Sequence, residues 1–141
     1  MAQVAVWVRD LDGMRAFYQS YFGAAAGSKY TNQRKQFESY FLTFPGGGRV
    51  ELMRRPDIAD RQREREEMGL AHLGIEVESD STVDALTSRL SRDGHRPVDG
   101  PRRTGDGYYE SIVLDPEGNR ILIVSAGGPW MPDKGTSAKA L

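Results

Sequence analysis

The chain has 141 residues, a formal net charge of −1 and no cysteine. That length suits one domain with its own hydrophobic core, and the near-neutral charge gives no general attraction to nucleic acid or anionic membranes. The lack of cysteine excludes disulfides, thiolate nucleophiles and cysteine-ligated zinc. No apolar run approaches the ~20 residues of a membrane span, and a first strand beginning by about Val4 leaves no room for a signal peptide. A cytoplasmic protein is therefore expected.

The first part of the chain predicts a strand, a helix and three further strands. Residues 3–8 alternate between valines on one face and a mixed set on the other: Gln3, Ala5 and Trp7. Residues 11–22 carry apolar side chains at helical spacing, with Asp10 as the expected N-cap and Gly23 just after the end. Further strands are predicted at residues 25–30, 37–44 and 49–53.

The second part of the chain repeats this order after a charged linker. The linker, residues 55–68, is dense in both signs of charge, and we expect it to be solvated and partly helical. A strand is predicted at 72–77 and a helix at 81–93 with its cap near Asp80 or Ser81. Strands follow at 97–103, 108–114 and 120–124. Residues 126–141 form a tail whose last ~10 residues are expected to be disordered.

The two parts form a repeat in which one carboxylate is lost. Aligning their first strands pairs Gln3 with His72, and aligning their last strands pairs Glu51 with Leu122. The aliphatic strand faces would pack under helices, and the mixed faces would line a cavity. The sequence therefore predicts one α+β domain of two tandem β-α-β-β-β modules, about 1–54 and 69–125. Together the modules would form a cup-shaped mixed sheet with the helices outside.

Two stretches of the second module carry a family resemblance. They are Gly-Leu-Ala-His-Leu-Gly-Ile-Glu-Val at 69–77 and Gly-Tyr-Tyr-Glu-Ser-Ile-Val-Leu-Asp-Pro-Glu-Gly-Asn-Arg-Ile at 107–121. With the duplicated module, they resemble the vicinal oxygen chelate superfamily over residues 3–125. That superfamily includes glyoxalase I, extradiol dioxygenases, fosfomycin-resistance enzymes and bleomycin-resistance proteins. The resemblance implies the fold, but it does not imply a single activity.

In that superfamily, the first and last strands of each module supply the metal ligands. The resemblance places these positions at Gln3, Glu51, His72 and Leu122. The first three side chains could hold a divalent ion such as nickel, cobalt, zinc or manganese. The fourth position is usually a glutamate, which in glyoxalase I also moves the substrate proton. Here it is Leu122, which can neither bind a metal nor accept a proton.

Three functions remain open on the sequence. The favoured one is a metal-free protein, like the bleomycin-resistance branch, that sequesters a drug or natural product and so gives antibiotic resistance. The second is a metal-dependent lyase, isomerase or dioxygenase-type enzyme that uses Gln3, Glu51 and His72, with Glu76 taking the proton. The third is a metal-free tailoring enzyme in which Glu51 and His72 act as general base and acid.

Several other side chains are predicted to line the cup or to lie outside it. Arg49 and Arg120 are possible partners for Glu51, and His95 is expected on the plain surface. Some of the tyrosines and Phe41 on neighbouring strands should also face the cup. The predicted ligand-binding residues are Gln3, Trp7, Arg49, Met53, Arg120, Leu122 and Trp130. The resemblance also implies a homodimer, and it leaves open whether one chain or two build each cup.

Overall fold

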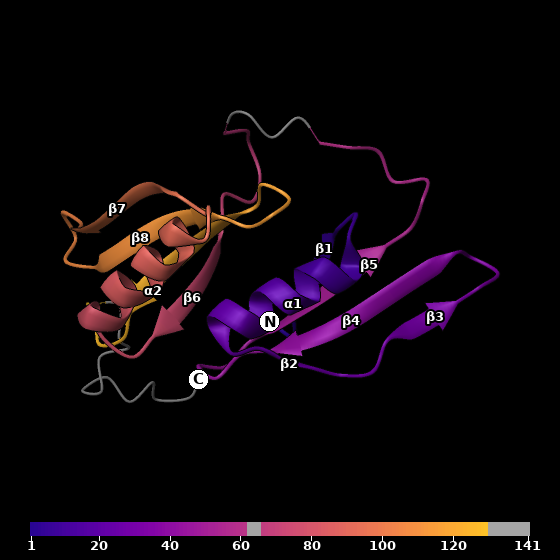
Figure 1. Cartoon of the computed structure of the whole chain (residues 1–141), viewed down its shortest axis with the longest axis horizontal. Helices are drawn as coiled ribbons and strands as arrows, with labels where there is room; N and C mark the ends of the chain where they lie inside the picture. Colours follow the sequence, from indigo (N-terminus) through magenta and orange to yellow (C-terminus); the bar gives the residue numbers. More distant parts are fainter. Residues whose placement is uncertain (62–65, 130–141) are drawn as a thin grey trace, which may run out of the picture.

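The structure is a computed structural model that describes residues 1–61 and 66–129. It contains two helices and nine strands in that part of the chain (Figure 1). In chain order these are β1 (Val4–Trp7), α1 (Leu11–Phe22), β2 (Ala25–Ala26), β3 (Tyr30–Asn32), β4 (Phe37–Thr43), β5 (Arg49–Arg54), β6 (Leu73–Val77), α2 (Asp80–Arg92), β7 (Pro97–Arg103), β8 (Tyr109–Leu114) and β9 (Arg120–Ser125). None of the helices among these residues is long and apolar enough to cross a membrane.

The α+β fold and its duplicated module are confirmed. Module 1 forms a sheet in the order β1-β5-β4-β2, with β3 also paired to β4, and module 2 forms a sheet in the order β6-β9-β8-β7. The first strand of each module runs parallel to the last one and lies at an edge of its sheet. The predicted strand 25–30 is two short strands instead, since β2 and β3 pair separately with β4.

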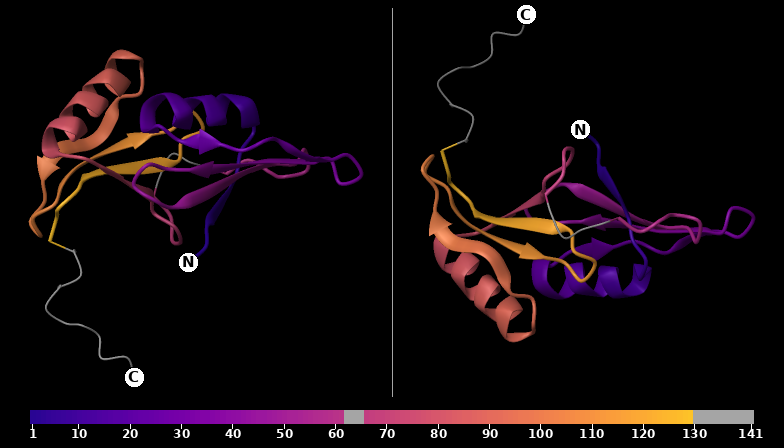
Figure 2. Two further views of the ribbon diagram at one scale, coloured as in Figure 1. Left: turned by 90° about the horizontal axis from the view of Figure 1, so that it is seen from below. Right: turned by 90° about the horizontal axis from the view of Figure 1, so that it is seen from above.

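Both helices cover the same side of the molecule, and the opposite faces of the two sheets are left open (Figure 2). The N-terminus and the linker project from this open side. Helix α1 begins after Asp10, whose carboxylate accepts from Gly13 N–H, and Gly23 closes it in the left-handed conformation, as predicted. Helix α2 is capped one residue earlier than predicted, by Ser79, which accepts from Thr82 N–H. The described linker residues, 55–61 and 66–68, contain no helix, and the remaining residues of the predicted linker lie outside the described part of the chain.

The aliphatic strand faces and the two helices form one continuous core. Leu42 and Leu52 of module 1, and Ile121 and Ile123 of module 2, are at most 1% exposed. Burying an apolar side chain of this size contributes about 1.5–3 kcal/mol to stability. The alternation read from the sequence thus assigned the buried faces correctly, and it also defines which face of each sheet is left open.

Contacts between the modules run through α1 rather than through the sheets. The Tyr18 hydroxyl donates to the buried Asp115 carboxylate at 2.7 Å. Glu117, in the turn before β9, accepts the backbone N–H groups of Arg9 and Asp10 at 2.7 and 2.9 Å. His95 is not on the plain surface as predicted, because its ring packs edge-on against the aromatic rings of α1. These contacts join the helix layer and leave the edges of β1 and β6 unpaired in the described chain.

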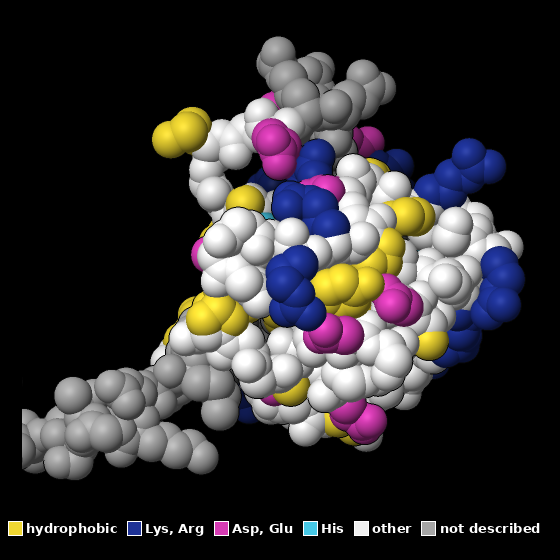
Figure 3. All heavy atoms as spheres, turned by 90° about the vertical axis from the view of Figure 1, so that its left-hand side faces the viewer, with side chains coloured by type: hydrophobic (Ala, Val, Ile, Leu, Met, Phe, Trp, Pro, Cys, Tyr) yellow, Lys and Arg dark blue, Asp and Glu magenta, His cyan; other side chains and the backbone are white. Residues whose placement is uncertain are grey.

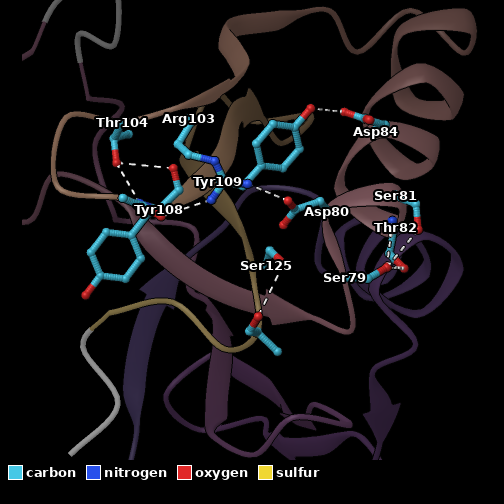
Figure 4. Close-up of polar contacts among 12 residues, drawn as sticks. Ser79, Asp80, Ser81, Thr82, Asp84, Arg103, Thr104, Tyr108, Tyr109 and Ser125 are labelled. Carbon is cyan, nitrogen blue, oxygen red and sulfur yellow. Dashed lines mark hydrogen bonds and ion pairs between the residues drawn. The ribbon is translucent and has the colours of Figure 1, made fainter.

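A polar network on the outer side of module 2 ties β7 and β8 to α2 (Figure 4). Arg103 donates to Asp80 at 2.6 Å, and the Tyr109 hydroxyl donates to Asp84 at 2.5 Å. The Ser125 hydroxyl and then Arg103 hold the pKa of Asp80 below its ordinary value. Because this network lies on the helix side, it stabilises the module without occupying the open face of its sheet.

Candidate functional site

The open face of module 1 is built by alternate residues of three neighbouring strands. The pairing register places Ala5 of β1 beside Glu51 of β5, and Glu51 beside Phe41 of β4. One row along, Trp7 lies beside Met53. Since successive side chains of a strand point to opposite faces, all of these project away from α1. Trp7 and Met53 thus occupy the face on which the sequence predicted them.

A hydrogen-bonded amide and carboxylate lie at the centre of this face. Gln3 Nε2 donates to Glu51 Oε1 at 2.9 Å, and both side chains are partly buried. The predicted arginine partners of Glu51 are wrong. Arg49 lies over the Phe41 ring at 5.1 Å, and Arg120 pairs with Glu66 at 3.7 Å. The pair leaves the second carboxylate oxygen of Glu51 and the amide oxygen of Gln3 available for a ligand.

Aromatic rings flank this polar centre. Phe37 packs edge-on against Trp7 at 6.2 Å between ring centroids and also against Tyr30 at 6.1 Å. The Arg55 guanidinium lies 5.2 Å from the Trp7 ring centre. Sequence reasoning missed Phe37, Tyr30 and Arg55 because they come into this row only through the pairing of β3 and β4, which alternation along one strand does not reveal.

Two of the tyrosines that the sequence left unassigned, Tyr40 and Tyr109, are directed away from the open face. Tyr40 is buried on the helix side, where its hydroxyl donates to Asp12 at 2.8 Å. Tyr109 also reaches the helix side, where it bonds Asp84. Of the aromatic residues on β4 and β8 that the sequence left unassigned, Phe41 therefore faces the open side and is 41% exposed.

In the row of residues equivalent to that of Glu51, the open face of module 2 is apolar. The next row is charged, because Val124 lies between Glu76 and Glu110 in the pairing register. Leu122 lies between Gly74 of β6 and Ile112 of β8 in the pairing register. Val124 is on the same face by alternation and is half-buried like Leu122. The position equivalent to Glu51 is thus set among aliphatic side chains. Glu76, the predicted proton acceptor, is exposed on this face of β6 near the end of the strand.

His72 lines a groove of ≈900 Å³ that also contains Trp7 and Arg120. The groove runs between β1, the linker and the turn before β9, and neither Gln3 nor Glu51 lines it. The structure therefore brings Gln3 and Glu51 together and places His72 apart from them.

Figure 3 views the module 2 end, where hydrophobic side chains gather between basic and acidic ones. Trp130, predicted to bind ligand, lies outside the described residues.

The side chains of one chain do not fit a divalent metal ion. Gln3 presents its amide nitrogen, which cannot ligate a metal, to the carboxylate that would be its fellow ligand. Leu122 supplies no donor, and in the described ranges no three His, Cys, Asp or Glu side chains come close enough to hold a metal. Catalytic zinc sites use three protein ligands around one point. The site is therefore treated as one without a resident metal ion.

The duplicated module and its open sheet faces define the class of the protein. The sequence model of the Glyoxalase/Bleomycin resistance protein/Dioxygenase superfamily matches residues 1–123, and the chain belongs to this superfamily. The match covers module 1 and all of module 2 but its last two residues, and it includes the open-face positions described above except Val124.

Individual relatives are distant. YqjT of Bacillus subtilis (strain 168) is 24% identical in an alignment of 137 positions that covers 89% of this chain and 98% of YqjT. A glyoxylase/bleomycin resistance protein/dioxygenase domain from Frankia sp. EAN1pec is 19% identical with a TM-score of 0.75, covering 89% of this chain and 90% of that one. The fosfomycin resistance protein FosX of Listeria monocytogenes is 17% identical with a TM-score of 0.66, covering 89% of each chain. At these identities the structural likeness shows the fold alone.

Proposed function

We propose that the protein binds a small organic molecule on the open faces of its two sheets without a resident metal ion, and that it sequesters a drug or natural product. The observation that carries this proposal is the pairing of Leu122 with Gly74 and Ile112. At the position where the superfamily commonly places a carboxylate, this chain has an aliphatic surface. Such a surface favours an apolar part of a ligand over an ion.

The open face of module 1 supplies complementary contacts. Small-molecule sites are lined mainly by apolar and aromatic side chains, with a few polar groups that fix the orientation of the ligand. Trp7, Phe37 and Phe41 supply the rings, and the Gln3–Glu51 pair supplies the polar group. Offset or edge-on contacts with rings are worth about 0.5–1.5 kcal/mol beyond burial. This arrangement suits a flat ligand with at least one hydrogen-bond donor.

The complete cup is proposed to form between two copies of the chain. The edges of β1 and β6 have no partner strand in the described residues. Large hydrophobic side chains are exposed on the open side: Tyr30 and Phe41 by pairing register, and Met68 and Leu70 in the segment between β5 and β6, which projects there (Figure 2). Exposed apolar patches commonly mark an interaction surface. A second copy would cover it and bring module 2 of one chain to module 1 of the other.

A binding screen tests the proposed function. Protein stripped of metal with a chelator is titrated with a panel of phenols, arylamines and aromatic acids, and binding is measured by calorimetry. We expect at least one compound to bind and Glu51→Gln to weaken that binding about tenfold. Glu78→Gln, on an exposed carboxylate beyond the end of β6, is the matched control and should leave the affinity unchanged. A wild-type protein that binds no compound of the panel, or that turns one over, contradicts the proposal.

A further inference from the structure

A glycine lies in the middle of β6, although no contact with the described residues and no backbone angle requires a glycine there. Gly74 is one of the five residues of that strand, and its φ is outside the left-handed region that favours glycine. A Cβ built there would meet only Leu122 Cδ2, at 3.9 Å, which is an ordinary contact. Glycine weakens a strand interior, and in strands it often marks close approach of a ligand or another backbone. The approaching group is therefore absent from residues 1–61 and 66–129, the part of the chain that the structure describes.

The direction in which a side chain at position 74 would point indicates where the approaching group lies. Leu73 and Ile75 on either side point to the core, so the hydrogen in place of a Cβ at Gly74 points into the open face. A neighbouring strand would pair with β6 in the plane of the sheet, where a Cβ does not interfere. What needs the space lies over the face, where Leu122 and Ile112 form an apolar floor.

The equivalent position in module 1 is also small. Ala5, in the middle of β1, is exposed and lies beside Glu51 in the register. The larger side chains of Gln3 and Trp7 stand two residues away on either side of it. Each module thus has a small residue at the same point of its first strand, and we call the space above Ala5 or Gly74 the notch of that module. The notch has a carboxylate beside it in module 1 and aliphatic side chains beside it in module 2.

We infer that the ligand is a two-ended molecule whose apolar end lies directly on the backbone at Gly74 and whose hydroxyl or amino group donates to Glu51 over Ala5. This inference rests on the proposed function and adds the chemical class: alkylphenols, arylamines and compounds with such groups. In the dimer proposed above, the module 2 notch of one copy and the module 1 notch of the other line one cup. An apolar molecule without a donor leaves the second carboxylate oxygen of Glu51 without a hydrogen bond, and burying that oxygen in this state is unfavourable.

The test uses two probes that differ by one hydroxyl, 4-butylphenol and butylbenzene. Wild-type protein should bind 4-butylphenol at least tenfold more tightly than butylbenzene. Gly74→Val should weaken binding of both probes at least tenfold, because the valine side chain fills the space that the apolar end of the ligand would occupy. Its melting temperature should stay the same or rise, since valine favours a strand more than glycine does. Glu51→Gln should instead weaken 4-butylphenol alone and so reduce the difference between the probes.

Gly105→Val is the matched control, because Gly105 lies in the turn between β7 and β8 with no atom within 4 Å of its built Cβ. It should bind both probes like wild type. A Gly74→Val variant that binds both probes like wild type overturns the inference and leaves the proposed function standing. A variant that loses binding only because it becomes monomeric in light scattering also overturns it, since the glycine would then serve contact between copies. Wild-type protein that binds neither probe nor any compound of the screening panel overturns the proposed function itself.

Discussion

At the scale of single residues, the difference between Glu51 and Leu122 decides what the protein can do. The two side chains occupy equivalent positions in the two modules, yet one accepts a hydrogen bond from Gln3 and the other packs beside Gly74 and Ile112. A carboxylate can bind a cation, accept a proton or accept a hydrogen bond, and a leucine can do none of these. The pairing of a polar half-site with an apolar one is therefore the basis of the proposed ligand class.

Restoring the lost carboxylate should restore metal binding. In the proposed dimer, Leu122→Glu and His72 of one copy would face Gln3 and Glu51 of the other, which gives a four-ligand set of a kind that nickel and cobalt accept. We expect the variant to retain about one such ion per chain after dialysis, measured by elemental analysis, and wild type to retain much less. Leu114→Glu, on the same face of β8 opposite Arg120, is the control and should behave like wild type. Equal metal content in all three proteins would contradict this reading of position 122.

The Tyr18–Asp115 contact should make the free energy of unfolding fall as the pH rises in the alkaline range. Burial, and then the neighbouring Asp115 charge, raises the pKa of Tyr18 well above its ordinary value. A group with a raised pKa in the folded state contributes stability that is fully present below its unfolded pKa, about 10 for tyrosine, and is lost as the pH rises further. Chemical denaturation should thus show the free energy of unfolding falling above about pH 10, and falling less in Tyr18→Phe.

The same substitution has a cost at neutral pH. Asp115 keeps its other donors, the backbone N–H groups of Glu117 and Asn119 and the Asn119 amide, so the loss should be only about 1 kcal/mol. Tyr30→Phe, on an exposed ring of β3, is the control and should change neither the stability nor its pH dependence. An alkaline slope in Tyr18→Phe equal to that of wild type would contradict the raised pKa of Tyr18.

At the scale of secondary structure elements, local patterns predicted more than pairing did. The bounds of α1 followed from its spacing and from Asp10 and Gly23, because the residues that begin and end a helix are its own neighbours. The register of β3 against β4, which brings Phe37 and Tyr30 to the site, depends on contacts between strands. His95 was misassigned because its neighbours in the sequence gave no sign that α1 would pack against it.

The linker shows a different limit. Its charges were consistent with a helix, but the described residues run instead along the groove beside β1 and pair with the modules, as Glu66 does with Arg120. For the candidate site, alignment of the repeat predicted Gln3, Glu51 and Leu122, and alternation along the first strand predicted Trp7. The sequence could not show that Gln3 and Glu51 bond each other while His72 lines the groove beside β1, because that depends on how the modules meet.

The cap of α2 provides a test at this scale. Ser79 accepts the Thr82 N–H at 3.2 Å, and N-cap serines replaced by alanine cost about 1 kcal/mol. Ser79→Ala should lower the free energy of unfolding by about that amount, measured by urea denaturation. Ser88→Ala, on the exposed side of the same helix, should be neutral or slightly stabilising because alanine is the better helix former. Equal effects of the two substitutions would contradict the assignment of the cap.

At the scale of the whole molecule, the exposed apolar side chains of the open side predict association. Met68 is 103% exposed and Leu70 is 79% exposed, whereas most side chains of this type are covered in folded proteins. We expect light scattering to show a dimer for wild type and a shift toward monomer for Met68→Ser combined with Leu70→Ser. Val98→Ser, on the outer edge strand β7, removes a comparably apolar exposed side chain and should leave the dimer intact. A monomeric wild type would contradict the shared cup.

The central claim is that this cup holds an organic ligand without a metal ion. The most direct measurement is calorimetric titration of chelator-treated protein with 4-butylphenol, repeated after addition of nickel, cobalt, zinc or manganese. We expect binding in the chelator-treated protein with a dissociation constant that the added ions change less than twofold. Binding that appears only after one of these ions is added would contradict it.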